Sequence, residues 1–128
     1  MAASTLNIRK ILGFKKDKSV FMLPHTTPIK ILVKEAYKRK IGAVLIGDDN
    51  GHCVGIITER DIMRCCANDI DLHKVTAGEI MSKDLKTINL DDDINHVMDI
   101  MITSHIRHLP VLSTNGIEGI ITIRDLIQ

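Results

Sequence analysis

Two segments of the chain carry the same side chains, at the same spacing, that could hold an anion and a sugar. Residues 55–61 read GIITERD and residues 119–125 read GIITIRD, so six of seven positions match at an offset of 64. Each segment is an apolar run that ends in a Thr, with an Asp three residues later. If the Thr begins a helix, the free N–H groups and the positive dipole end there suit a phosphate. The Asp could then accept hydrogen bonds from both hydroxyls of a ribose.

The Thr and Asp of each segment also have a purely structural interpretation. A Thr at the start of a helix and an acid three positions later form a capping box, which stabilises the helix by about 1 kcal/mol. The box is imperfect here, because Asp is shorter than the Glu or Gln usually found at that position. Sequence physics alone leaves both interpretations open for Thr58 with Asp61 and for Thr122 with Asp125.

The helices that precede these motifs are repeated as well. In both copies, apolar residues recur at positions i, i+3, i+4, i+7 and i+8, the spacing of an amphipathic helix. They are Ile29, Leu32, Val33, Ala36 and Tyr37 in the first copy and Ile94, Val97, Met98, Met101 and Ile102 in the second. We expect Thr27 to cap the first helix, with Pro28 at its first position.

Two short strands and an exit helix follow each of these helices. The strands cover 43–47 and 54–58 in the first copy and 109–113 and 117–122 in the second. Each pair is joined by a turn that contains Asn-Gly, a strong hairpin signal. The exit helices cover 59–67 and 123–128, and extended stretches at 20–23 and 86–90 precede the copies. The sequence therefore predicts an α+β fold of two β-α-β-β-α repeats packed together, because neither can bury its sheet alone.

These elements divide the chain into four segments. We expect a leader helix and loop over residues 1–19, repeats over 20–67 and 77–128, and a linker over 68–76. The apolar residues Leu6, Ile8, Ile11 and Leu12 mark the leader helix. The charge-rich segment 15–19 is predicted to form a solvated loop.

Further segments join the two motifs in a pattern that resembles a known family. They are IGAVL at 41–45, the turn DDNG at 48–51, EIM at 79–81 and IRHLPV at 106–111. Together they resemble a tandem pair of cystathionine-β-synthase (CBS) domains, over about 110 of the 128 residues and with no catalytic domain attached. The resemblance implies an intramolecular pseudo-dimer, called a Bateman module. It also implies a cleft between the repeats that commonly holds AMP, ADP, ATP, NAD or S-adenosylmethionine.

The resemblance also implies which residues hold the ligand. In the family, the segment before the first hairpin strand encloses the adenine, and the Asp that holds the ribose usually comes from the opposite repeat. One predicted site therefore comprises Ile41, Gly42, Ala43, Ile120, Thr122, Arg124 and Asp125; the other comprises Ile106, Arg107, His108, Ile56, Thr58, Arg60 and Asp61. The small Gly42 and Ala43 leave room for a ring, which favours the first site for adenine. Arg107 and His108 instead supply cationic donors that suit phosphate.

Composition and charge exclude several classes of protein. The net charge is +1, from 17 basic and 16 acidic residues, which excludes a nucleic-acid binder that works by bulk electrostatics. The aromatic content of 2% is too low for a platform on which single strands stack. No apolar run reaches the ~18–20 residues of a membrane span, and no secretory signal is recognisable. We therefore expect a cytoplasmic protein without a nucleic-acid or membrane partner, in which the cysteines are reduced.

The chain shows no nucleophile–base pair, paired acids or phosphate-transfer loop, and its histidines lack the spacing of a zinc site. We therefore predict a binding module, not an enzyme, with no metal. Its ligand is an adenosine nucleotide, with AMP preferred, and its signal passes to an unidentified effector protein. Ile31 and Ile100 lie outside the main helix stripes and favour a homodimer. Two alternatives stay open: an interaction module whose clefts are empty, and an enzyme that acts on a nucleotide.

Overall fold

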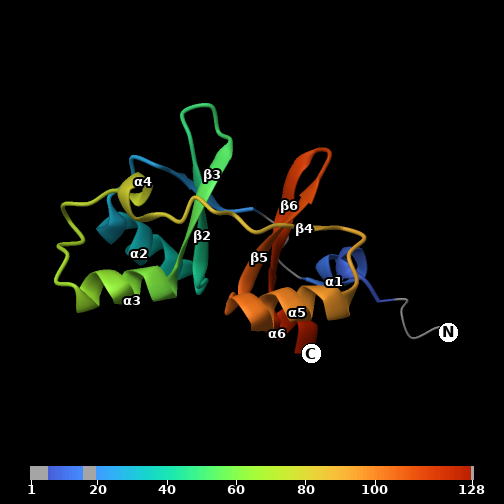
Figure 1. The fold of residues 1–128 in the computed structure, drawn as a ribbon. Helices are drawn as coiled ribbons and strands as arrows, with labels where there is room; N and C mark the ends of the chain where they lie inside the picture. The colour runs from blue at the N-terminus through green and yellow to red at the C-terminus, as the bar shows by residue number, and fades with distance from the viewer. Residues whose placement is uncertain (1–5, 16–19, 128) are drawn as a thin grey trace. The chain divides into compact units, whose positions relative to one another are not determined.

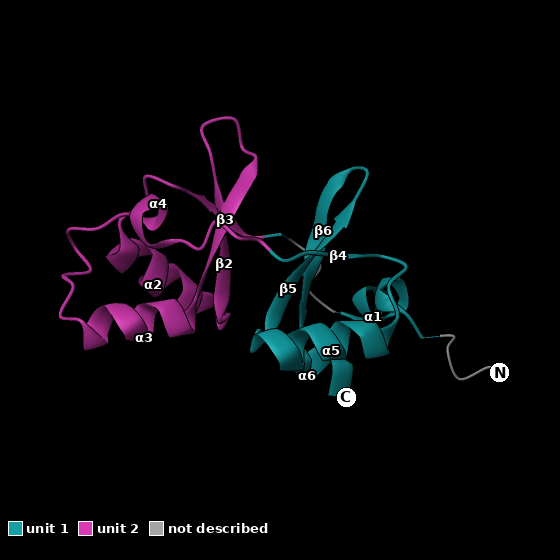
Figure 2. Ribbon diagram, in the orientation of Figure 1, with its two compact units in different colours: residues 1–20, 86–128 teal, residues 21–85 magenta. Residues whose placement is uncertain are grey.

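The structure, a computed structural model, describes residues 6–15 and 20–127 of the chain. These residues form two compact units, drawn in teal and magenta in Figure 2. Unit 2 is one continuous segment, Phe21–Leu85, whereas unit 1 combines Met1–Val20 with Lys86–Gln128. Each unit contains one of the two repeated motifs.

Unit 2 is built on a three-stranded sheet. Its elements, in chain order, are β1 (Met22–Pro24), α2 (Ile29–Arg39), β2 (Ala43–Gly47), β3 (Cys53–Thr58), α3 (Glu59–Ala67) and α4 (Ala77–Ile80) (Figure 1). β2 lies in the middle of the sheet, parallel to β1 and antiparallel to β3. All five residues of β2 are buried, which explains why its sequence is a continuous apolar run.

Unit 1 repeats this topology. Its elements are α1 (Ile8–Phe14), β4 (Ile88–Asn89), α5 (Ile94–Ser104), β5 (His108–Ser113), β6 (Gly116–Thr122) and α6 (Ile123–Ile127). β5 is the central strand, parallel to β4 and antiparallel to β6. The predicted α+β class, with the order β-α-β-β-α in each repeat, is therefore confirmed. Gln128, predicted to end the last helix, lies outside the described residues.

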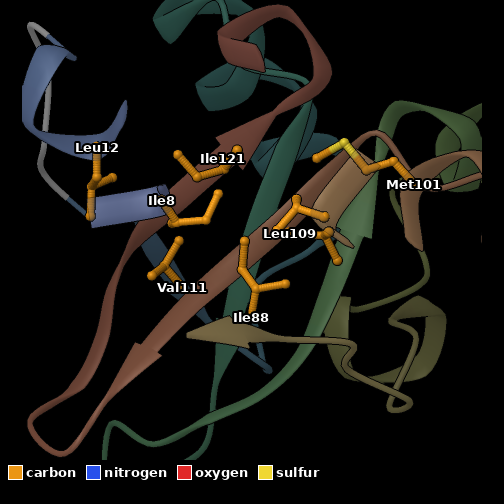
Figure 3. Packing of buried hydrophobic residues seen from close by; sticks show 8 residues of the cluster. Ile8, Leu12, Ile88, Met101, Leu109, Val111 and Ile121 are labelled. Carbon is orange, nitrogen blue, oxygen red and sulfur yellow. The ribbon is translucent and has the colours of Figure 1, made fainter. Parts of the chain in front are cut away.

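The leader helix α1 is part of the hydrophobic core of unit 1. Figure 3 shows Ile8 and Leu12 beside Val111 and Ile121 of the sheet, and Ile8 is fully buried. The predicted leader helix is thus present over Ile8–Phe14, as an element of the unit that contains the second repeat. Of the predicted loop at 15–19, residues 16–19 lie outside the described residues.

In unit 2 the short helix α4 and Met81, the residue after it, contribute to the hydrophobic core, as α1 does in unit 1. Ala77 of α4 is fully buried in the core of unit 2. The side chain of Met81 lies so close to Gly55 that a Cβ on this glycine would clash with it. The matching Gly119 in unit 1 lies under Leu12, whose Cδ1 would be 2.8 Å from an added Cβ. The glycine that opens each motif is therefore explained by the side chain that packs over it.

The start of α2 differs from the prediction. The helix begins at Ile29, and no side chain caps it. The backbone N–H groups of Ile29 and Lys30 donate to the carbonyl oxygens of Val75 and Leu72, at 2.9 and 3.0 Å. The predicted cap by Thr27 is wrong, because carbonyl groups of the linker satisfy the N–H groups that a capping side chain would otherwise serve.

Replacing Ile8 tests whether α1 belongs to the core. Ile8→Ala removes fully buried atoms, so we expect a loss of about 2–5 kcal/mol in the free energy of unfolding, measured by urea denaturation. Phe14→Ala, on the same helix, is the matched control, because Phe14 is 75% exposed. This control should change the free energy of unfolding by less than about 0.5 kcal/mol. Equal losses in the two variants would show that α1 is not held by its buried face.

Candidate functional site

In unit 2, the motif residue Thr58 lies beside the segment Ile41–Ala43. Ala43 of β2 pairs with Thr58 of β3, and the Glu59 N–H donates to the carbonyl oxygen of Gly42 at 2.9 Å. The start of β2 and the start of α3 therefore meet at one end of the sheet. The structure thus brings the predicted adenine segment next to the motif of its own repeat.

The same arrangement recurs in unit 1. His108 of β5 pairs with Thr122 of β6, and the Ile123 N–H donates to the carbonyl oxygen of Arg107 at 3.0 Å. Each repeat therefore places the predicted adenine segment and the motif Thr at the same end of its sheet. The joining of one repeat's segment with the other repeat's motif, which the resemblance implies, stays a prediction.

A left-handed residue at the end of the long helix leads into each of these segments. Lys40 follows α2 with φ of 58°, and His105 follows α5 with φ of 55°. The N–H groups of the next residues, Ile41 and Ile106, donate to helix carbonyl oxygens five residues earlier, at 3.1 and 3.0 Å. Because this C-terminal turn is the same in both repeats, the two Ile residues are placed alike. Ile41 is exposed and Ile106 is half-buried.

Asp61 caps α3, as the structural interpretation of the motif predicts. Its Oδ2 accepts hydrogen bonds from the Thr58 N–H at 2.8 Å and the Thr58 hydroxyl at 3.3 Å. Its Oδ1 accepts from Arg64 Nη2 at 2.9 Å. The capping box at the start of α3 is complete in both directions. Asp61 is the one buried charged residue among those described, and the three hydrogen bonds to its two oxygens hold its carboxylate in a fixed orientation.

Asp125 has the matching role in unit 1. Its Oδ2 accepts from the Thr122 N–H at 2.8 Å, and its own N–H donates to Thr122 Oγ1 at 3.3 Å. The capping interpretation is therefore confirmed for both copies of the motif. Capping uses only part of the capacity of a carboxylate, which can accept about four hydrogen bonds, so it does not exclude ligand binding.

Lys15, at the end of α1, contacts motif residues that lie far away in the sequence. Its Nζ donates to Asp125 Oδ2 at 3.0 Å and to the carbonyl oxygen of Ile120 at 2.7 Å. Only 24% of its side chain is exposed, so the prediction that Lys15 lies in a solvated loop is wrong. The partners are 105 and 110 residues away in sequence, and no local pattern could have indicated the contact.

These contacts lower the pKa of the Asp125 carboxyl below its ordinary value of 3.8. Burial alone would raise this pKa, because it disfavours the charged form. The hydrogen bond from the Thr122 backbone and the Lys15 ammonium outweigh burial. Asp125 is therefore a carboxylate at neutral pH, the form that can accept hydrogen bonds from hydroxyl groups.

A hollow of about 220 Å³ lies in unit 2 beside the predicted adenine segment. Its lining is largely apolar and comprises Leu32, Val33, Ala36, Tyr37, Ile41, Gly42, Ala43, Val44, Ile57, Thr58, Glu59 and Ile62. Four of these, Ile41, Gly42, Ala43 and Thr58, are predicted site residues. Small-molecule sites usually measure about 300–1,000 Å³, so this hollow has room for one ring or part of a larger ligand.

The other predicted site residues differ in how accessible they are. Arg60, Arg107 and Arg124 are exposed to solvent. Ile56, Ile120 and His108 are half-buried. The main chain of Ile56 exchanges two hydrogen bonds with Ser82, at 3.0 and 3.1 Å. Ile56 in unit 2 and Ile120 in unit 1 are thus each held by a segment outside the motif.

Over residues 6–15 and 20–127, no three or more His, Cys, Asp or Glu side chains gather in a way that could hold a metal ion. None of the helices in this part of the chain is long and apolar enough to span a bilayer.

The sequence matches known proteins over most of its length. A family model, the CBS domain, matches residues 16–68 and 77–128. A 17.7 kDa protein from Acidianus ambivalens is 36% identical over 111 residues, which covers 85% of this chain. The chain spans 66% of the length of that protein.

Solved structures share the fold. A CBS-domain containing protein from Agrobacterium tumefaciens has a TM-score of 0.90 at 25% identity, over 99% of this chain and 95% of that chain. A CBS domain protein from Pyrobaculum aerophilum, complexed with AMP, has a TM-score of 0.82 at 26% identity, over 95% and 91%. The CBS domain pair of protein MJ0100, in complex with 5′-methylthioadenosine and S-adenosyl-L-methionine, has a TM-score of 0.81 at 29% identity, over 94% and 92%.

The lowered pKa of Asp125 predicts a specific loss of stability in acid. The folded state favours the carboxylate, so this stabilisation is present above the ordinary pKa of 3.8 and is lost as the pH falls through the lower folded value. Between about pH 5 and about pH 2, Asp125→Asn should lose less free energy of unfolding than the wild type, measured by urea denaturation at each pH. Asp99→Asn on α5 controls for the removal of one exposed carboxylate. Parallel losses in the wild type and Asp125→Asn would contradict the prediction.

Proposed function

This chain belongs to the CBS-domain family, and from that premise we propose that it is a regulatory module that binds an adenosine ligand. One observation carries the proposal: each repeat holds an oriented Asp carboxylate, Asp61 or Asp125, at the same end of its sheet as the main chain of Gly42 or Arg107. Relatives of similar fold were solved with AMP and with S-adenosyl-L-methionine and 5′-methylthioadenosine, which supports an adenosine as the common part of the ligand.

The proposed roles of the residues follow from their chemistry. Asp61 and Asp125 accept hydrogen bonds from ribose hydroxyls, and the exposed Arg60, Arg107 and Arg124 are available to a phosphate. Gly42 and Ala43, which line the hollow in unit 2, leave space for the adenine ring. With arginines near both motifs, a nucleotide suits the sites better than a nucleoside, and we propose AMP as the preferred ligand.

We further propose that binding regulates a partner protein by linkage. A ligand at a hundredfold excess over its Kd stabilises the state that binds it by about 2.7 kcal/mol. It changes the relative setting of the repeats only if its affinity differs between two settings. This ligand-dependent change is then transmitted to an effector protein. In this proposal the chain acts as a binding module and not as an enzyme.

A homodimer is the second part of the proposal. Ile31 on α2 is 49% exposed and Ile102 on α5 is 62% exposed, and exposed apolar helix residues of this kind favour an interface. Ile100, by contrast, packs against the core of unit 1, so it does not add to such a surface. The same observation favours the alternative function, a dimerisation module whose sites stay empty.

A thermal-shift panel separates the two functions. AMP, ADP, ATP, NAD and S-adenosylmethionine are each added at millimolar concentration to the full chain. At least one should raise the Tm by about 10 °C or more, because a ligand at a hundredfold excess contributes about 2.7 kcal/mol and each kcal/mol corresponds to about 4–8 °C in a domain of 60–100 residues. No shift with any of the five would leave the dimerisation module as the better account.

Substitution of the motif carboxylates tests the site. Asp61→Ala or Asp125→Ala should weaken binding about tenfold or more, because a hydrogen bond to a charged group contributes about 1.5–3 kcal/mol. Both variants also lose a helix cap. Asp93→Ala is the matched control, because Asp93 caps α5 through a 2.8 Å hydrogen bond from the Asn95 N–H and lies outside both motifs. If calorimetry gives wild-type affinity for both motif variants, the site assignment is wrong.

A further inference from the structure

The two motif carboxylates are paired with cations from different parts of the chain. In unit 2 the cation is Arg64, three residues after Asp61 on the same helix, with Nη2 2.9 Å from Oδ1. The position that matches Arg64 in the second repeat is Gln128, which carries no charge. There the cation is Lys15, whose Nζ is 3.0 Å from Asp125 Oδ2. A residue outside the repeat thus replaces a charge that the second repeat lacks.

The docking of α1 holds Lys15 in place. Its backbone N–H donates to the carbonyl oxygen of Leu12 at 3.2 Å, and Leu12 packs into the core over Gly119. The Lys15 side chain is 24% exposed, whereas that of Arg64 is 60% exposed. A less exposed charge is screened less by water and salt, so the charge of Lys15 is screened less than that of Arg64.

We propose that Lys15 selects for phosphorylated adenosine ligands, over uncharged nucleosides, at the motif of unit 1. This inference rests on the proposed function, in which Asp125 binds the ribose. Without a cation, the Asp125 carboxylate would repel a phosphate bound nearby. Lys15 balances that charge. Its ammonium has three N–H donors, of which the carbonyl oxygen of Ile120 and the Asp125 carboxylate use two, so a phosphate oxygen can take the third.

The experiment compares AMP with adenosine, which differ only in the phosphate. Both are titrated by calorimetry into the full chain and into Asp61→Ala, in which binding reports the motif of unit 1. In the Asp61→Ala background, Lys15→Met should weaken AMP binding about tenfold and adenosine binding by less than about threefold. Lys10→Met, which removes an exposed lysine from the same helix, should change neither affinity. Lys15→Arg keeps the charge and should retain most of the preference for AMP.

Each other outcome overturns the inference in a recognisable way. Equal weakening of AMP and adenosine by Lys15→Met would mean that Lys15 only orients Asp125. Binding by the wild type that is lost in Asp61→Ala would place the ligand at the other motif and leave the proposed function standing. No binding of any adenosine ligand to the wild type would reject the proposed function and the inference together. If Lys15→Met does not fold, as judged by its thermal unfolding, Lys15→Gln serves in the same comparison.

Discussion

The hydrogen bond from the Thr backbone N–H to the Asp carboxylate, 2.8 Å long in each motif, is the interaction on which both repeats depend. It fixes the turn from the last strand into the exit helix. That turn places the exit helix where its first N–H bonds to the segment before the central strand, at Gly42 and Arg107. Because the carboxylate that builds the turn is also the group proposed to hold the ribose, the structural and functional interpretations of the motif are complementary.

The packing around each motif comes from segments outside the β-α-β-β-α repeat. Leu12 covers Gly119 in unit 1, and Met81 covers Gly55 in unit 2. Next to these contacts, Lys15 and Ser82 bond to the main chain of the motif residues Ile120 and Ile56. The leader helix and the segment 81–82 that follows α4 therefore support the strands that present the motif.

Much of the fold could be predicted because its signals are local and occur twice. The helix stripes, the Asn-Gly turns and the GIIT motifs each depend on neighbouring residues, and the repeat allows one copy to check the other. The pairing of Arg64 with Asp61 could be predicted from the sequence, since a basic residue three positions after an acid lies on the same helix face. Lys15 was not, because its partner is 110 residues away. The predicted Thr27 cap is wrong for the same reason, because carbonyl oxygens of the distant linker accept the hydrogen bonds from the first N–H groups of α2.

The place of α1 in the core of unit 1 has a consequence for how the chain folds during its synthesis. Unit 2 is continuous in sequence, so it can close as soon as its own residues have been made. Ile8 and Leu12 instead pack against Val111 and Ile121, strand residues that are synthesised about a hundred positions later. The leader thus remains without its core partners until these strands have been synthesised. Closing so long a loop slows the assembly of unit 1 and leaves apolar side chains open to chaperones until the last strand arrives.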